Sequence, residues 1–256
     1  MKPINIMLIL LFGLILTACG SGGTTEPDQN TADLSTQEQA ELVASALSAQ
    51  QGGVEDDITT ATQAATGASA QRLQLQDTLG YTISVNVDFY DEWDNLQDTY
   101  DPDTTDRIDY QSLIQGRITN GTGFFRELSI DNRSDFSVRQ ILTGIAWING
   151  THTNHSSYDR TQPLTQADVH YQLDCELILT DVTVDLDAAD TFPESGTIEG
   201  TIAGSYQRVA PTWQQTSQFN FHFVATYLGD NTAEVEFDDG TIFTVHLDSG
   251  TVENLE

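Results

Sequence analysis

Two histidines three residues apart, His152 and His155, stand with Asp159 in a polar stretch, and His170 follows after the next predicted turn. Two imidazoles and a carboxylate can bind zinc and leave one coordination position open, as a hydrolytic centre requires. The spacing lies in a predicted polar hairpin rather than on a helix, and on a strand it would send the two rings to opposite faces. Two exposed loop histidines are the alternative interpretation.

A second group of candidate ligands is the acidic loop at residues 91–106, where Asp101, Asp103 and Asp106 could bind calcium through carboxylates and carbonyls. The loop lacks the central glycine and terminal glutamate of an EF-hand, and carboxylates are abundant throughout the chain. Calcium is therefore a possible cofactor, and no other cofactor is indicated. The sequence contains no G-x-S-x-G, P-loop or C-x-x-C motif, so we do not expect an enzyme.

The charge balance restricts the partners. Thirty-nine acidic residues face nine basic ones, and the formal net charge is −30. Such a field repels nucleic acid and anionic lipid headgroups, so a nucleic-acid partner is excluded. Solubility in a salty exterior explains the excess, and calcium binding is the alternative explanation.

The N-terminus carries a basic start at Lys2, an apolar run over residues 6–16 that is too short to span a bilayer, and Leu-Thr-Ala-Cys-Gly at residues 16–20. This pattern resembles the signal peptide and lipobox of bacterial lipoproteins. The resemblance implies that residues 1–18 are removed, that Cys19 is lipidated and anchors the protein to the membrane, and that Gly20 permits transport to the outer membrane. The domain would then face the periplasm or the cell exterior. Several acyl chains together anchor a protein firmly.

The mature chain divides into three predicted parts: a flexible tether at residues 19–34, a helical neck at 35–70 and an antiparallel β domain at 78–256. Ser35 and Glu38 form a capping box that starts a helix, and Gly52-Gly53 should end it. A second helix at residues 55–70 has a mostly alanine face that would bury little. The two helices would form a neck or a lid on the sheet, and a coiled coil is less supported.

From residue 81 the apolar period changes to two, which predicts strands. About ten strands with short turns and no intervening helix predict a mainly β fold, an antiparallel meander that forms a barrel, a half-barrel or a sandwich. We expect turns at Asn149-Gly150 and Asp239-Gly240 and a bulge near Thr180-Asp181. The predicted strands are residues 81–89, 108–119, 124–130, 136–148, 169–186, 198–206, 218–227, 233–237 and 242–247.

A candidate ligand site lies on two neighbouring predicted strands. Gly200 and Gly204 share a face with Ile198 and Ile202, and a turn near residues 211–212 would place the glycines opposite Phe223 and Phe219. Glycine opposite a phenyl ring allows a sheet to coil. The curved face could hold an apolar ligand, or the rings could fill the space themselves. The candidate ligand-binding residues are Ile198, Ile202, Phe219, Phe221 and Phe223.

Cys175 sits on an apolar face and is expected to be a buried hydrophobe rather than a reactive thiol. The leading hypothesis is a non-enzymatic outer-membrane lipoprotein that binds an apolar small molecule or an envelope protein. A half-barrel would be similar in outline to the lipoprotein-carrier proteins of the bacterial envelope, although no motif matches them. The alternatives are a calcium-bridged surface adhesin or matrix protein, and a metal-dependent hydrolase that uses the histidine cluster.

Overall fold

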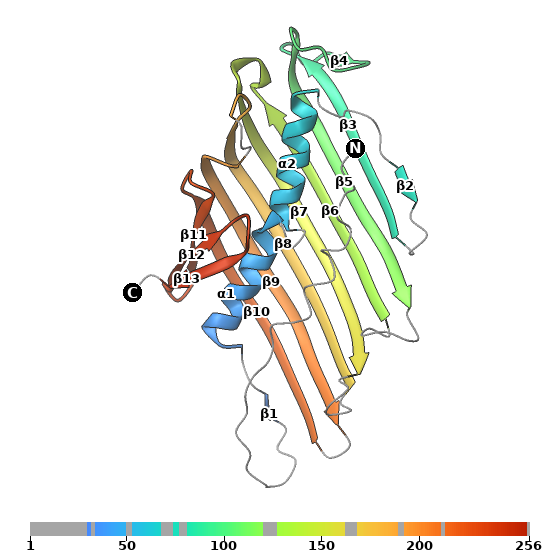
Figure 1. The fold of residues 1–256 in the computed structure, drawn as a ribbon, viewed down its shortest axis with the longest axis vertical. Helices are drawn as coiled ribbons and strands as arrows, with labels where there is room; N and C mark the ends of the chain where they lie inside the picture. Colours follow the sequence, from blue (N-terminus) through green and yellow to red (C-terminus); the bar gives the residue numbers. More distant parts are fainter. Residues whose placement is uncertain are drawn as a thin grey trace.

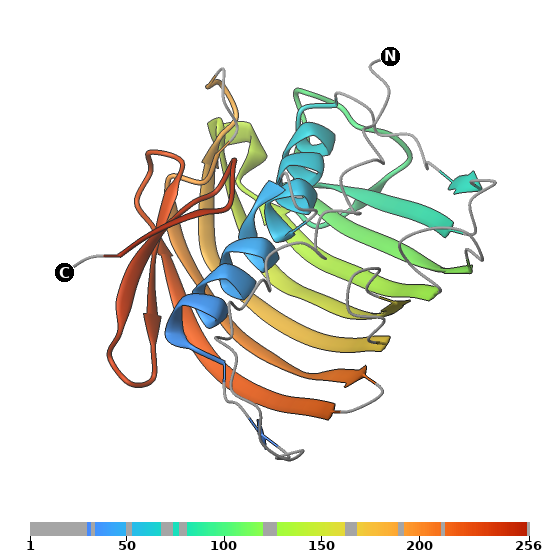
Figure 2. The same cartoon turned by 60° about the horizontal axis from the view of Figure 1, so that its bottom comes forward.

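One open, strongly curved antiparallel sheet dominates the structure, a computed structural model that describes residues 30–31, 34–49, 53–67, 74–76, 81–119, 127–161, 168–188, 192–210 and 213–254. The sheet is an 11-strand meander in the order β13-β12-β11-β10-β9-β8-β7-β6-β5-β3-β2, and it does not close. Its longest strands run diagonally and curve around two helices (Figures 1 and 2). The predicted fold class is confirmed in its half-barrel form. Cys19 and the signal segment lie outside the described residues.

The strands lengthen toward the middle of the sheet and shorten at both edges. The elements are α1 (Thr36–Leu47), α2 (Val54–Ala65), η3 (Ile141–Thr143), β1 (Asn30–Thr31), β2 (Gln74–Gln76), β3 (Tyr81–Asp91), β4 (Leu96–Gln97), β5 (Thr105–Thr119), β6 (Glu127–Arg139), β7 (Ile145–Thr161), β8 (Asp168–Asp185), β9 (Ser195–Ala210), β10 (Trp213–Tyr227), β11 (Thr232–Phe237), β12 (Ile242–His246) and β13 (Thr251–Asn254). The short β4 pairs with β3, and β1 adds to β10 as a parallel strand.

Both helices lie in the concavity of the sheet (Figure 2). The capping box is present, because Ser35 accepts from the Glu38 amide and the Glu38 carboxylate accepts from the Ser35 amide. α1 ends at Leu47, before the predicted stop at Gly52-Gly53. Val54, Ile58 and several alanines of α2 are fully buried, so the expectation that this helix would bury little is wrong.

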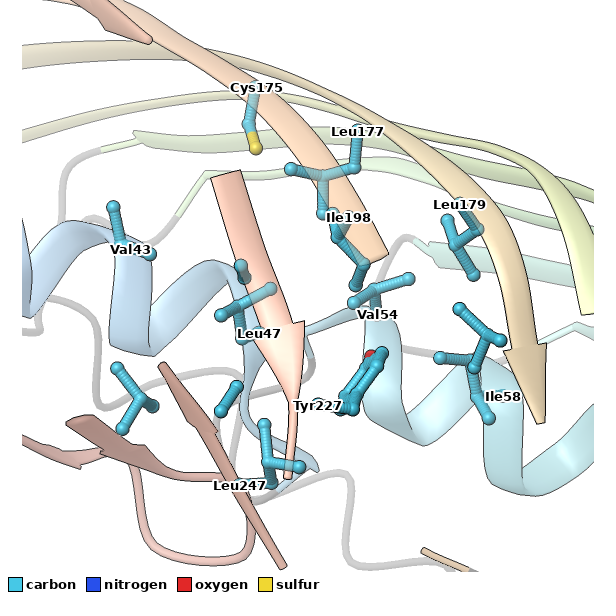
Figure 3. Close-up of a cluster of buried hydrophobic side chains, with 14 of the residues drawn as sticks. Val43, Leu47, Val54, Ile58, Cys175, Leu177, Leu179, Ile198, Tyr227 and Leu247 are labelled. Carbon is cyan, nitrogen blue, oxygen red and sulfur yellow. The ribbon is translucent and has the colours of Figure 1, made fainter. Parts of the chain in front are cut away.

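The helices share one hydrophobic core with the sheet rather than forming a neck. Val43 and Leu47 of α1, Val54 and Ile58 of α2, and Cys175, Leu177, Leu179, Ile198, Tyr227 and Leu247 of the β segment form one cluster between the layers (Figure 3). The helices are therefore a lid on the concave face. Among the described residues, neither helix is long and apolar enough to cross a membrane.

The turn between β6 and β7 lies earlier than the sequence predicts. The predicted strand at residues 136–148 is divided by η3, where Gln140 and Gly144 adopt left-handed φ angles of 63° and 78°. Gly150 instead lies within β7 beside a register shift, where a Cβ would come within 2.1 Å of the Asp135 carbonyl oxygen. The glycine of this Asn-Gly pair thus permits close backbone approach and does not form a hairpin turn. The bulge near Thr180-Asp181 is confirmed by a register shift between Thr180 and Thr183.

Candidate ligand-binding face

Strand register assigns the inward side chains of the curved sheet, because residues directly opposite one another in neighbouring strands share a face. On β8, Leu173, Cys175, Leu177 and Leu179 are buried, whereas the residues between them point outward. Their partners on β9 are Gly204, Ile202, Gly200 and Ile198. We call the surface that these residues share with the helices the concave face, and the opposite surface the convex face.

All five predicted ligand-binding residues lie on the concave face. Ile198, Ile202, Phe219 and Phe223 are buried, and Phe221 is partly buried. Phe223 pairs with Gly200 and Phe219 with Gly204, in the predicted register. A Cβ added to Gly200 or Gly204 would come within 2.4 or 2.6 Å of these rings. The rings therefore fill the space above the glycines, and a ligand at this end of the face would have to displace them.

Asp57 of α2 is buried against three strands and fixes the lid to the sheet. Its carboxylate accepts hydrogen bonds from Tyr110 Oη at 3.1 Å, Ser112 Oγ at 2.8 Å and Ser134 Oγ at 2.7 Å, and it lies 3.3 Å from His152 Nδ1. Burial alone would raise the pKa of Asp57, but the hydrogen bond and charge of His152, together with Ser134 and Ser112, hold this pKa below its usual value.

The composition of this group resembles that of a catalytic triad, but its geometry does not. In a triad the imidazole lies between the serine and the carboxylate and uses a different nitrogen for each. Here Ser134 Oγ and Asp57 Oδ2 both approach the same nitrogen, Nδ1 of His152, and Ser134 already donates its proton to Asp57. His152 is 2% exposed. The contacts connect the lid to the sheet and do not prepare a nucleophile.

Glu55, two residues earlier on α2, is a second buried carboxylate, 1% exposed. Tyr227 of β10 donates a hydrogen bond to its Oε1, while its Oε2 is buried without a partner. Burial raises the pKa of Glu55 to about 8, against the opposing effect of the Tyr227 hydrogen bond. At neutral pH this carboxyl is therefore mostly protonated, and α2 contacts the sheet with one charged and one neutral acid.

Two further polar residues of the concave face, Asn132 of β6 and Asn154 of β7, form a cross-strand pair next to the Ser134–His152 pair. The Oδ1 atoms of both carboxamides are buried and have no hydrogen-bond partner. The Tyr171 hydroxyl on β8 is also buried and unpartnered. Sequence analysis missed all three residues. Alternate residues of β7 face inward, and this alternation could have revealed the polar pair. The pattern is weak because few of these residues are apolar: Gly150, His152, Asn154, Ser156 and Tyr158.

The structure separates the predicted metal ligands. His152 and His155 lie in β7 rather than in a loop, with His152 buried on the concave face and His155 half-exposed on the convex face. One metal ion therefore cannot bind both rings. Asp159 is on the convex face beside His170, and His155 pairs with Asp174 at 2.8 Å. The assignment of His152 to an exposed loop is wrong, because strand parity turns it inward.

In the acidic loop, the carboxylates of Asp101 and Asp106 accept hydrogen bonds from backbone amides. Asp101 accepts from the Asp103 amide at 2.9 Å, and Asp106 accepts from the Leu142 amide at 3.3 Å. Within the described ranges, no group of three or more His, Cys, Asp or Glu side chains is placed to hold a metal ion. Cys175 is buried as predicted, and burial raises the pKa of its thiol to about 12.

The comparisons with known proteins add no relative. No family model matches the sequence, and no curated protein or solved structure matches it. The candidate function therefore depends on the geometry of the concave face and on the N-terminal sequence pattern.

Proposed function

We propose that this protein is a non-enzymatic, lipid-anchored lipoprotein of the bacterial outer membrane that binds an apolar or amphiphilic ligand on the concave face of its half-barrel. The observation that carries the proposal is the placement of α1 and α2 as a lid inside an open, curved sheet. An open sheet of this curvature has a large apolar inner face that must be covered by helices, by a ligand or by both in turn.

The contacts of α2 support exchange between lid and ligand. Besides its buried Val54 and Ile58, α2 meets β5, β6 and β7 through Asp57 and its hydroxyl and imidazole partners. Water can replace these hydrogen bonds when the helix leaves, so this polar part of the contact costs less to break than an equal apolar area. The anchor at Cys19 would hold the domain near the lipid from which an apolar ligand comes.

Ligand binding is tested with Nile red, a neutral probe that the net charge does not repel, and with the chain from residue 20 onward, which contains every described element. We expect saturable 1:1 binding that weakens severalfold in Phe221→Ala on the concave face. Val224→Ala, on the convex face of the same strand, is the matched control and should bind as the wild type does. Absence of binding, or equal losses in both variants, would argue against a concave-face ligand site.

The anchor is tested separately on the full-length chain in bacteria. Metabolic labelling with palmitate should label the protein, and Cys19→Ser should abolish both the label and membrane retention. A labelled Cys19→Ser protein would show that the anchor lies elsewhere. This result would not affect the ligand experiment, because that experiment uses the chain without Cys19.

A further inference from the structure

The Asn132–Asn154 pair lies on the concave face, on β6 and β7, next to the residues of these strands that contact Asp57. One step along the strands toward the lid are Ser134 and His152, which bind Asp57. In the other direction are Ile130 and Ser156. The flanking strands place Ile114 and Cys175 beside the two asparagines. The pair is thus a polar island with apolar neighbours on β5 and β8.

Both Asn side chains hold an unused acceptor in this island. Asn132 is 4% exposed, and its Oδ1 has no partner. The Oδ1 of Asn154, directly opposite, is also buried without one. Buried acceptors are nearly always hydrogen-bonded in folded proteins, because an unsatisfied one destabilises the fold. Leucine has nearly the shape of asparagine and would avoid this loss, so a role in stability does not explain the pair.

A ligand donor explains the pair. We infer that Asn132 and Asn154 recognise an amphiphile that carries a hydrogen-bond donor, an amide N–H or a hydroxyl, next to its apolar chain. A carbonyl oxygen accepts such a donor, whereas a bare hydrocarbon or an ester leaves it unsatisfied. The uncharged carboxamides also suit a neutral ligand group in a chain of net charge −30. This inference rests on the proposed function and names the ligand class of the same site.

Two probes that differ in a single donor test this recognition: N-methyldecanamide has one N–H, and N,N-dimethyldecanamide has none. Titration calorimetry with the chain from residue 20 onward should show about tenfold tighter binding of the N-methyl compound, the usual effect of one buried hydrogen bond. The Asn132→Leu/Asn154→Leu double variant should bind both compounds equally. The same change at Asn220, which is exposed on β10, should leave the preference intact.

The outcomes separate this inference from the proposed function. If the wild type binds neither compound or Nile red, the apolar ligand site itself is refuted. If it binds both compounds equally, and the double variant does the same, the ligand site stands and amide recognition by the Asn pair is refuted; ordered water then satisfies these acceptors. Circular dichroism and urea unfolding of the double variant check the fold, and we expect no loss of stability relative to the wild type.

Discussion

Glu55→Gln should remove a pH dependence of stability that the buried Glu55 carboxyl produces. Its pKa is raised from 4.5 to about 8 in the folded protein by burial. Between these two values the folded state holds a proton that the unfolded state has lost. The free energy of unfolding must then fall as the pH rises, by up to about 1.4 kcal/mol per pH unit.

The full effect is roughly 5 kcal/mol between pH 4.5 and 8, as an upper bound from the same relation. This is a large part of the free energy of unfolding of a typical folded domain, which is about 5–15 kcal/mol. Glutamine is neutral at every pH and keeps an oxygen that can accept from Tyr227. Glu55→Gln should therefore be as stable as the wild type near pH 4.5 and more stable by several kcal/mol at pH 8.

The assay is urea unfolding followed by circular dichroism at half-unit intervals from pH 4.5 to 8.5, at constant ionic strength. The free energy of unfolding of the wild type is subtracted from that of Glu55→Gln at each pH. The difference gives the contribution of Glu55, because the other titrating groups contribute to both proteins. Glu234→Gln on the exposed face of β11 is the matched control and should follow the wild type. Parallel curves for the wild type and Glu55→Gln would refute a raised pKa at this carboxyl and with it the neutral contact to the sheet.

Three further experiments test other parts of the fold. Asp57→Ala should lower the free energy of unfolding by roughly 3–5 kcal/mol, because it leaves the buried groups that bind Asp57 without a partner, whereas Gln63→Ala on the exposed side of α2 should change it by less than about 0.5 kcal/mol in urea unfolding. Gly200→Ala should cost about 1–3 kcal/mol in the same assay, because its Cβ would overlap the Phe223 ring. In the chain from residue 20 onward, Cys175 should react with a thiol reagent only on unfolding, since its thiol is buried with a raised pKa; fast native labelling would contradict this.

Signals confined to one helix or to two adjacent strands were predictable. Ser35 and Glu38 are three residues apart, so the capping box could be found from sequence alone. The pairing of Gly204 with Phe219 required only a correct turn position and strict alternation, and the structure has this register. The bulge near Thr180-Asp181 followed from a parity shift within one strand.

The lid contacts were not predictable, because they depend on distant partners. Acidic residues in the first turn of a helix normally complement the helix dipole at the surface, and this is the ordinary interpretation of Glu55 and Asp57. Their burial depends on residues far along the chain: Ser112 and Ser134 are 55 and 77 positions from Asp57, and Tyr227 is 172 positions from Glu55. No local sequence pattern distinguishes these acids from solvent-exposed ones, because only the curved sheet of the folded protein buries them.

The two helices meet the sheet by different chemistry, so the proposed ligand would act on them differently. α1 buries Val43 and Leu47 in an apolar cluster, so its departure would expose area at about 25 cal/mol per Å². α2 also buries Val54 and Ile58, but Asp57 adds contacts that water can replace. A ligand with its own hydrogen-bond donor would compete for the polar strip on β6 and β7 beside α2. The amide exchange rates of α2 should therefore rise more than those of α1 when N-methyldecanamide is bound. A rise confined to α1 would place ligand entry at the β12–β13 side of the lid.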